Sequence, residues 1–316
     1  MFDVASTPDL LRLLVIPVFT WAAWHDIKTR RITDRVWPPL VVLAVVLLVW
    51  DAYTLAAIGG FSARLFTIQV VLSIGLVIPL AYLFYTLGAF GGADFKALAV
   101  LALLFPSYPT YVLDGLLLPL TVAAIGVFSL TILSNTVIVA LAYPVWLCLR
   151  NTVRRRFEIV MFVGHPVQWD RIEWKYGRLL ESPSGYTRHG LDLDALRMYL
   201  EWRNVSLADI RANPDYYRDP SSLPEQPGQV GDGSIVRTDG GAQSDPWGAR
   251  AFVDDIGQWY GTTPEILRDG LDVLATRDHV WVSPGIPFIV PMFFGLLLAL
   301  TYGDLLFGIL QSFGLL

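Results

Sequence analysis

Two aspartates stand where an ionisable side chain is costly to keep, at the edges of long apolar runs. Asp94 lies in the stretch 90–96, Phe-Gly-Gly-Ala-Asp-Phe-Lys, between the apolar runs Leu65–Leu87 and Ala97–Phe105. Asp26 closes the first apolar run of the chain. A carboxylate within or beside a membrane segment marks a functional site by default. Two such groups can share a proton, so that one acts as a base toward water and the other as an acid toward a carbonyl, which is the chemistry of aspartyl proteases.

The composition is typical of a membrane protein. Of the 316 residues, 54% are hydrophobic and 16% are charged, and the net charge is −5. Apolar runs near the ~20 residues that cross a bilayer recur through the first half. The basic triplet Arg154–Arg156 follows such a run, which predicts a topology anchor and not a nucleic-acid site. With Cys148 as the single cysteine and four scattered histidines, the sequence predicts no metal and no cofactor.

The distribution of Lys and Arg predicts how the chain crosses the membrane. The segment 26–35 carries four of these residues, so the positive-inside rule places it in the cytoplasm and the N-terminus outside. Val36–Trp50 then crosses outward, the Gly- and Ala-containing stretch 51–64 forms an outside loop, and Leu65–Leu87 returns. This order of crossings puts both aspartates at the same, cytoplasmic face of the membrane. Ala97–Phe105 then crosses outward again as a short fourth membrane segment.

The second half predicts one further crossing, a polar domain and a last crossing. Leu116–Leu149 is long enough for one tilted helix, or for two short helices broken near Ser134. One helix is favoured because it leaves the arginines that follow it inside. Residues 151–283 are polar and acidic, with a mobile linker at about 219–245 that is rich in Pro, Gly and Ser. Residues 284–316 then carry the sixth membrane helix.

The predicted fold is therefore an all-α polytopic membrane protein with an inserted domain. Residues 1–150 form a membrane domain whose five transmembrane helices carry both aspartates, and a cytoplasmic α+β soluble insert lies between helices five and six. Within this insert, hydrophobic spacing and capping residues predict helices over Leu191–Trp202, Ser206–Arg211, Trp247–Trp259 and Pro264–Ala275 (with Thr263 as its N-cap), and strands over Phe157–Val163 and His279–Val282.

Other polar residues at helix ends compete with the two aspartates for a functional role. A lone aspartate at such a position is usually a cap, and Asp304, beyond the last apolar run, is the strongest competitor. The order of crossings places Asp304 near the outer face, away from the other two. His25 points to another side of its helix than Asp26 and receives no catalytic role. Gly91 and Gly92 let the backbone approach a substrate closely and are candidates for substrate binding.

The two motifs resemble those of a known family. The runs Asp-Ile-Lys-Thr-Arg-Arg-Ile-Thr-Asp-Arg from Asp26 and Gly-Gly-Ala-Asp-Phe-Lys from Gly91 are similar to those of the archaeal prepilin and preflagellin peptidases. These are membrane aspartyl proteases of the Gly-x-Gly-Asp type, and the resemblance takes in six membrane helices and the Ser283–Phe288 entry to the last helix. The sequence departs from the strict pattern at Ala93, where the full motif has glycine.

The resemblance implies an activity and a set of partners. It makes Asp26 and Asp94 the catalytic pair of an endopeptidase in the cell membrane, with its active site at the cytoplasmic side. The substrates it implies are precursors of type IV pilin-like proteins or archaellins, whose short basic leader is removed. Bacterial relatives that also methylate their product commonly carry a paired Cys-x-x-Cys module, which this sequence lacks. Partners are thus the precursors and the lipid bilayer, with no nucleic acid.

Three other functions remain open at this point. A presenilin-like intramembrane aspartyl protease shares the Gly-x-Gly-Asp logic, but its aspartates lie deeper in the hydrocarbon. A transporter would use Asp94 and Asp304 as ion sites, and it predicts matching broken helices in two repeats, which the sequence does not show. A scaffold anchored by its helices leaves the glycine-rich break and the paired aspartates unexplained.

Overall fold

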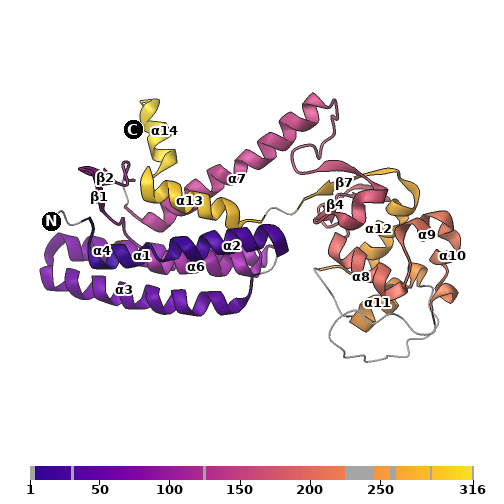
Figure 1. Ribbon diagram of the computed structural model, residues 1–316, viewed down its shortest axis with the longest axis horizontal. Helices are drawn as coiled ribbons and strands as arrows, with labels where there is room; N and C mark the ends of the chain where they lie inside the picture. Colours follow the sequence, from indigo (N-terminus) through magenta and orange to yellow (C-terminus); the bar gives the residue numbers. More distant parts are fainter. Residues whose placement is uncertain are drawn as a thin grey trace. The chain divides into compact units, whose positions relative to one another are not determined.

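The computed structural model of this chain describes residues 4–29, 32–123, 126–224, 245–256, 261–284 and 287–314. These residues are mostly helical and form two compact units (Figure 1). The first unit consists of Met1–Tyr143 and Pro287–Leu316, and the second is Pro144–Ile286. Each unit has its own hydrophobic core.

The first unit is built almost entirely of apolar helices. They are α1 (Thr7–Arg12), α2 (Val15–Thr29), α3 (Trp37–Ile58), α4 (Gly60–Leu72), α5 (Ile78–Thr86), α6 (Gly92–Leu104), the first part of α7 (Phe128–Val153), α13 (Ile289–Thr301) and α14 (Leu305–Ser312). A π-helical segment, Ser73–Val77, joins α4 to α5. The only described strands of this unit, β1 (Tyr111–Leu113) and β2 (Leu116–Leu118), form an antiparallel hairpin.

Several of these helices are suited to crossing a membrane. Four stretches among the described residues are long and apolar enough to cross a membrane: Thr7–Thr29, Asp34–Ile58, Gly60–Thr86 and Phe128–Val153. The helix α13 is apolar but shorter. The chain is therefore a multi-pass membrane protein. The six crossings stay a prediction, because the 13 residues of α6 span about 20 Å as a helix, less than the hydrocarbon thickness of about 30 Å.

The structure corrects two sequence predictions in and beside these helices. The prediction of an outside loop at 51–64 is wrong. α3 continues to Ile58 and α4 begins at Gly60, so that Gly59 alone separates the two helices. Gly59 and Gly60 both have positive φ, which lets the chain turn there. The favoured single helix over 116–149 is confirmed by the unbroken α7, but its predicted start is wrong, since residues 116–118 belong to the hairpin.

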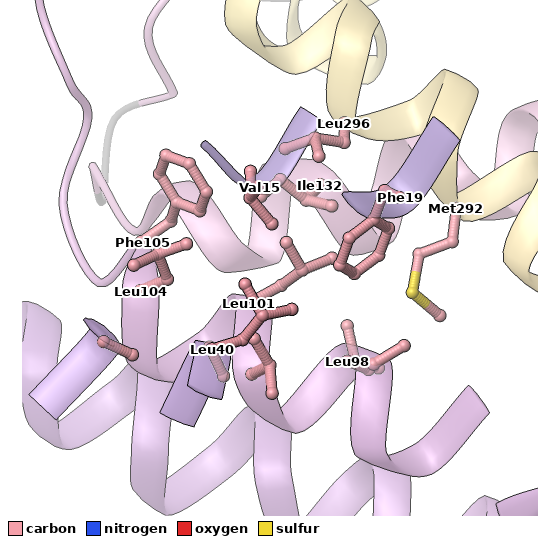
Figure 2. Close-up of a cluster of buried hydrophobic side chains, with 14 of the residues drawn as sticks. Val15, Phe19, Leu40, Leu98, Leu101, Leu104, Phe105, Ile132, Met292 and Leu296 are labelled. Carbon is pink, nitrogen blue, oxygen red and sulfur yellow. The ribbon is translucent and has the colours of Figure 1, made fainter. Parts of the chain in front are cut away.

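The core of the first unit surrounds α6, which contacts α3, α5 and α13. Figure 2 shows Leu98 and Leu101 of α6 packed among Phe19 of α2, Leu40 of α3 and Met292 of α13. All five side chains are buried. From Ala97 onward α6 carries only apolar residues, as expected for a helix enclosed on all sides. The charged residues of α6, Asp94 and Lys96, therefore both lie within its first five residues.

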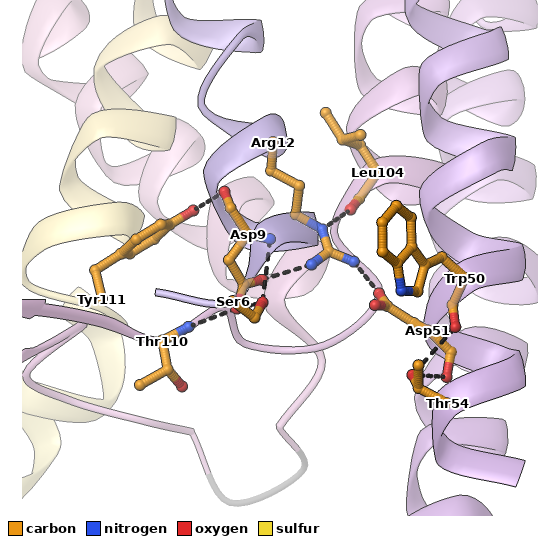
Figure 3. A network of polar contacts seen from close by, with 9 residues as sticks. All are labelled: Ser6, Asp9, Arg12, Trp50, Asp51, Thr54, Leu104, Thr110 and Tyr111. Atoms are coloured by element: carbon orange, nitrogen blue, oxygen red, sulfur yellow. Dashed lines mark hydrogen bonds and ion pairs between the residues drawn. The ribbon is translucent and has the colours of Figure 1, made fainter. Parts of the chain in front are cut away.

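A buried ion network fixes the opposite, C-terminal end of α6 (Figure 3). Arg12, only 4% exposed, donates from Nε to the carbonyl oxygen of Leu104 at 2.8 Å. Its other nitrogens form ion pairs with Asp9, at 2.5 Å, and with Asp51 of α3. The hydroxyl of Tyr111 donates to the carbonyl of Asp9 at 3.0 Å. One guanidinium thus holds α1, α3 and the end of α6 together.

The second unit is a small α+β structure. Its helices, beyond the end of α7, are α8 (Leu193–Arg203), α9 (Leu207–Ala212), α10 (Pro214–Arg218), α11 (Ala249–Ile256) and α12 (Pro264–Thr276). An antiparallel sheet has the order β3 (His165–Gln168), β7 (His279–Ser283), β4 (Arg178–Leu179), and β5 (Glu181–Ser182) pairs with β6 (Gly185–Tyr186).

Most predicted elements of the second unit are confirmed. The helices predicted over 191–202, 206–211, 247–259 and 264–275 correspond to α8, α9, α11 and α12, although residues 257–259 lie outside the described part of the chain. Thr263 caps α12 by accepting a hydrogen bond from the amide of Ile266. β7 confirms the strand at 279–282. The strand predicted over Phe157–Val163 is wrong, because those residues form turns. Most of the predicted linker at 219–245 lies outside the described residues.

We expect Arg12→Met to destabilise the first unit by about 3–5 kcal/mol, because it leaves two partly buried carboxylates and the Leu104 carbonyl without their donor. Unfolding in mixed micelles titrated with dodecyl sulfate measures this loss. Arg64→Met is the matched control: Arg64 is exposed on α4, and its replacement should change stability by no more than about 0.5 kcal/mol. Equal losses in the two variants would show that the network is not structural.

Candidate active site

Asp26 projects into the first unit from the last turns of α2. Helical spacing puts it on one face with Phe19, Ala22 and Ala23, all of them buried. Asp26 itself is 9% exposed, whereas its neighbour Trp24 is exposed on another side of the helix. The apolar face of α2 therefore ends in a buried carboxyl group, three residues before the end of the helix.

Asp94 lies in the first turn of α6, ahead of the apolar segment that begins at Ala97. Its Oδ2 accepts a hydrogen bond from the amide of Gly91, the N-cap residue, at 2.8 Å. A Cβ at Gly91 would lie 3.1 Å from that oxygen, closer than ordinary contacts, so the missing side chain lets the carboxylate approach the backbone. Ala93 has a helical backbone within this turn, where glycine is not required.

The structure brings the two aspartates within electrostatic interaction of each other. The pKa of Asp94 is raised to about 7, first by burial and then by the negative charge of Asp26, while the hydrogen bond from Gly91 opposes the shift. Burial disfavours the ionised carboxylate, and a like charge nearby disfavours it further. Both effects favour the neutral, protonated form of Asp94.

A second contact ties the same ends of the helices together. Lys96 of α6 donates from Nζ to Oδ1 of Asp34 at 2.6 Å, and Asp34 lies in the connection between α2 and α3. Asp34 is largely exposed and Lys96 is partly exposed, so the ion pair contributes little to stability. The ion pair shows that the residues directly before α3 lie beside the start of α6. The basic side chain of Lys96 is directed to Asp34.

Aromatic rings surround the glycine-rich break, and the sequence analysis did not assign them to the site. Phe90 packs against Phe288, which precedes α13, with the two ring centroids 4.6 Å apart. Phe95 packs against Tyr82 and Tyr85 of α5, with centroids 5.8 and 5.9 Å apart. These contacts hold the segment between α5 and α6 on both sides. The concentration of Phe and Tyr around Asp94 is the signal that could have identified them.

The competing polar residues have structural roles. Asp304 is the N-cap of α14: Oδ1 accepts from the amide of Phe307 at 2.9 Å, and Oδ2 accepts from the hydroxyl of Thr131 at 2.8 Å. It follows the C-terminal end of α13, whose N-terminal end adjoins Phe90 through Phe288. The 13 residues of α13 place Asp304 about 20 Å from the Asp94 end. His25 stacks on the exposed ring of Trp21.

The donor set of this site is suited to proton transfer. Among the described residues there is no group of three or more His, Cys, Asp or Glu side chains that could hold a metal ion. One carboxyl group that is readily protonated beside a second one is the arrangement in which an acid and a base act together on one substrate.

Comparison with family models gives two matches. The model described as the type IV leader peptidase family matches residues 13–145, and the model described as archaeal peptidase A24 C-terminus, type II, matches residues 258–305. Together they cover more than half of the chain. The first range contains both aspartates and the second contains α12, β7 and α13. A search of curated proteins found no match.

We expect Asp26→Asn to lower the pKa of Asp94, because it removes a neighbouring negative charge, while burial, the larger cause, keeps that pKa above its usual range. Titration of the carboxyl signals by NMR in protein with ¹³C-labelled aspartate measures the shift. Asp304→Asn is the control, since its carboxyl lies far from Asp94, and it should leave the titration unchanged. An unaltered Asp94 pKa in Asp26→Asn would show that the two groups do not interact.

Proposed function

Because this chain belongs to the type IV leader peptidase family, in its archaeal branch, we propose that it is an aspartic endopeptidase in which Asp26 and Asp94 activate water. Membership of the family implies pilin-like precursors as substrates. We propose that the enzyme cuts the peptide bond between a short basic leader and the hydrophobic stretch of a pilin-like or archaellin precursor. The reaction takes place at the cytoplasmic face of the cell membrane.

The observation that carries this proposal is the electrostatic interaction of Asp26 with Asp94, whose pKa is raised to about 7. A peptide bond is hydrolysed by carboxyl groups only if one is ionised and the other protonated at the same pH. Asp94 is the group that holds the proton, because burial favours its neutral form. Asp26 then serves as the ionised partner.

The proposed reaction proceeds in two balanced steps. Asp26 takes a proton from water, the water oxygen forms a bond to the peptide carbonyl carbon, and Asp94 transfers its proton to the carbonyl oxygen. This gives a tetrahedral gem-diol. In the second step one hydroxyl of the gem-diol returns a proton to Asp94, the carbonyl forms again, and the C–N bond breaks as the nitrogen takes the proton from Asp26. Both carboxyl groups end in their starting states.

The hydrogen bond from Gly91 suggests which oxygen of Asp94 faces the substrate. Oδ2 accepts from the Gly91 amide, so Oδ1 is left to carry the proton toward the carbonyl. The glycines also leave the backbone of this break open: a Cβ at Gly92 would meet only the ring of Tyr85, at 3.8 Å. We propose that an extended precursor segment lies along Gly91 and Gly92, beside the exposed faces of Tyr82 and Tyr85.

The cytoplasmic location is supported by charge and by helix order. Basic residues follow Asp26 in the segment 26–35, which the positive-inside rule retains in the cytoplasm. The pair of Lys96 and Asp34 links that segment to the start of α6. We therefore propose that residues 1–150 and 284–316 lie in the membrane, with the N-terminus outside, and that residues 151–283 form a cytoplasmic domain.

The alternative functions are less well supported by the site. A presenilin-like enzyme would hold its aspartates deep in the hydrocarbon, but Asp26 and Asp94 lie within one turn of a helix end. A transporter would use Asp94 together with Asp304, whose two carboxylate oxygens accept hydrogen bonds from the hydroxyl of Thr131 and the amide of Phe307. A scaffold gives no reason for a proton-holding carboxyl group beside a second one.

We expect Asp26→Asn and Asp94→Asn each to reduce cleavage of a leader-bearing precursor by at least about a hundredfold, because each removes one partner of the acid–base pair. Asparagine has nearly the same shape, so the fold should persist. The measurement is the fraction of precursor processed in membranes that contain each variant.

The matched controls for this assay are Asp34→Asn and Asp304→Asn, which alter aspartates of the same unit that lie outside the pair. Both should retain processing, and an added chelator should have no effect. Normal cleavage by Asp26→Asn would overturn the pairing of Asp26 with Asp94.

We expect the cleavage rate to fall as pH rises through about 7, because the proton that Asp94 must give to the carbonyl is bound below its raised pKa and lost above it. Well above that pH the rate should decline about tenfold per pH unit. Initial rates in membranes buffered from acid to alkaline pH measure this limb, with recovery of activity after return to neutral pH as the control against denaturation. A rate that rises above pH 8 contradicts the proposed role of Asp94 as acid.

A further inference from the structure

The segment that follows α7 is a folded loop held by one buried side chain. Asn151 is 1% exposed, and its Nδ2 donates to the carbonyl oxygens of Met161 and Gly164, both at 2.8 Å. Val160 packs inward against Leu180 and the sheet residue Trp281. The loop at 156–164 is therefore fixed to the end of α7 and to the sheet of the second unit.

This loop presents large apolar side chains outward although it is fixed in place. Phe157, Ile159, Phe162 and Val163 are all exposed, and Ile159 is 82% exposed. A second loop, before β4, adds Trp174, which is 81% exposed, and Tyr176. We call these six residues the sheet-end surface. Val160 is buried whereas its neighbours are exposed, so one side of the loop faces the sheet and the other side faces outward.

Both loops lie at the same end of the three-stranded sheet. Gly164 precedes β3 and a Cβ there would lie 2.9 Å from the carbonyl oxygen of Val282; Gly177 precedes β4, and a Cβ there would clash with the carbonyl oxygen of Ser283. Val282 and Ser283 are the last residues of β7. The two loops thus adjoin the end of β7 from either side.

Positive charge gathers at this end of the sheet. The pKa of His165, the first residue of β3, is lowered to about 4, first by burial and then by the charges of Arg150, Lys175, Arg156 and Arg154. These four cations therefore lie around His165. None of the ion pairs found among the described residues involves any of the four. Their charge is available to an anion from outside the second unit.

The chain itself connects this end of the sheet to membrane helices. α7, which is apolar and long enough to span a bilayer, ends at Val153, directly before the first loop. β7 ends at Ser283, and the apolar helix α13 begins at Ile289. Both connections leave the sheet where β3 begins and β7 ends. This end of the sheet is therefore reached within a few residues from the two apolar helices α7 and α13.

Exposed apolar side chains are otherwise scarce in the second unit. Among its described residues, Tyr186 and Tyr216 are the only large hydrophobic side chains that are exposed outside α7 and the sheet-end surface. Contiguous apolar surface of this kind marks an interaction site. Apolar side chains beside unpaired arginines are the combination by which interfacial segments bind anionic bilayers.

We propose that the sheet-end surface inserts into the headgroup region of the bilayer and that Arg150, Arg154, Arg156 and Lys175 bind the phosphates of anionic lipids. The occupant of this surface is the lipid bilayer. The inference is independent of the proposed peptidase activity, since it concerns only how the second unit is held at the membrane. It gives that unit an attachment to lipid besides its two covalent connections.

The test places a fluorescent label on the surface in the full chain. A Cys148→Ala background carries Phe162→Cys or, as the matched control, Tyr216→Cys, each labelled with an environment-sensitive dye. Both are exposed aromatic positions of the second unit. The proteins are reconstituted in phosphatidylcholine vesicles with phosphatidylglycerol. We expect the dye at position 162 to lose most of its emission to nitroxide-labelled lipid and to resist iodide, and the dye at 216 to do the reverse.

Further variants distinguish insertion into lipid from a perturbed loop and from a contact between copies of the chain. Trp174→Cys tests the second loop with the same expected result, in case Phe162→Cys perturbs the first. Omission of phosphatidylglycerol, or combined Arg154→Gln and Arg156→Gln, should weaken lipid quenching at position 162. Equal iodide quenching at 162, 174 and 216 would overturn the proposal. Shielding that disappears on dilution of the protein in lipid would overturn it in favour of a contact between copies.

Discussion

A helix enclosed by other apolar helices can carry charge only at its ends, and α6 shows this constraint at both. Its first turn holds Asp94, which accepts from the free amide of Gly91, and its last carbonyl, on Leu104, accepts from Arg12. These charges have the signs that the helix dipole favours at each end. The N-terminal dipole and the Gly91 amide stabilise the ionised carboxylate, yet burial outweighs them and raises the pKa of Asp94. The raised pKa of Asp94 thus results from desolvation, against the effect of the local hydrogen bond.

The same constraint explains why the candidate site and the ion network lie at opposite ends of the first unit. Arg12 binds α1 and α3 to the C-terminal end of α6, and α1 leads directly into α2, which ends near Asp26. The contacts of Arg12 therefore help to fix the position of α2 along α6, and this position determines where Asp26 lies relative to Asp94. Asp304 belongs to the network end, where Thr131 and the amide of Phe307 use both of its carboxylate oxygens.

Sequence reasoning was successful where one physical signal dominated. The positive-inside rule and the order of crossings placed Asp26 and Asp94 at one face, and the structure brings the two groups together, although their catalytic role stays a prediction. Capping chemistry located α12, because Thr263 and Pro264 fit only the start of a helix. The hairpin at 111–118 was missed, yet Asp114 and Gly115, both with positive φ, are a recognisable turn signal between apolar residues.

Other elements depended on long-range contacts that no local pattern contains. The stretch 157–163 is apolar enough for a strand, but the side chain of Asn151 binds carbonyl groups that a sheet partner would need. The same competition explains its exposed side chains. In water, that arrangement would leave Phe157, Ile159 and Phe162 exposed and would lose the free energy that burial of their apolar surface contributes. A bilayer surface removes the conflict, because it covers the apolar side chains while the arginines beside them meet lipid phosphates. The loop at 157–163, which was wrongly predicted to be a strand, thus has a conformation that is suited to contact with a membrane.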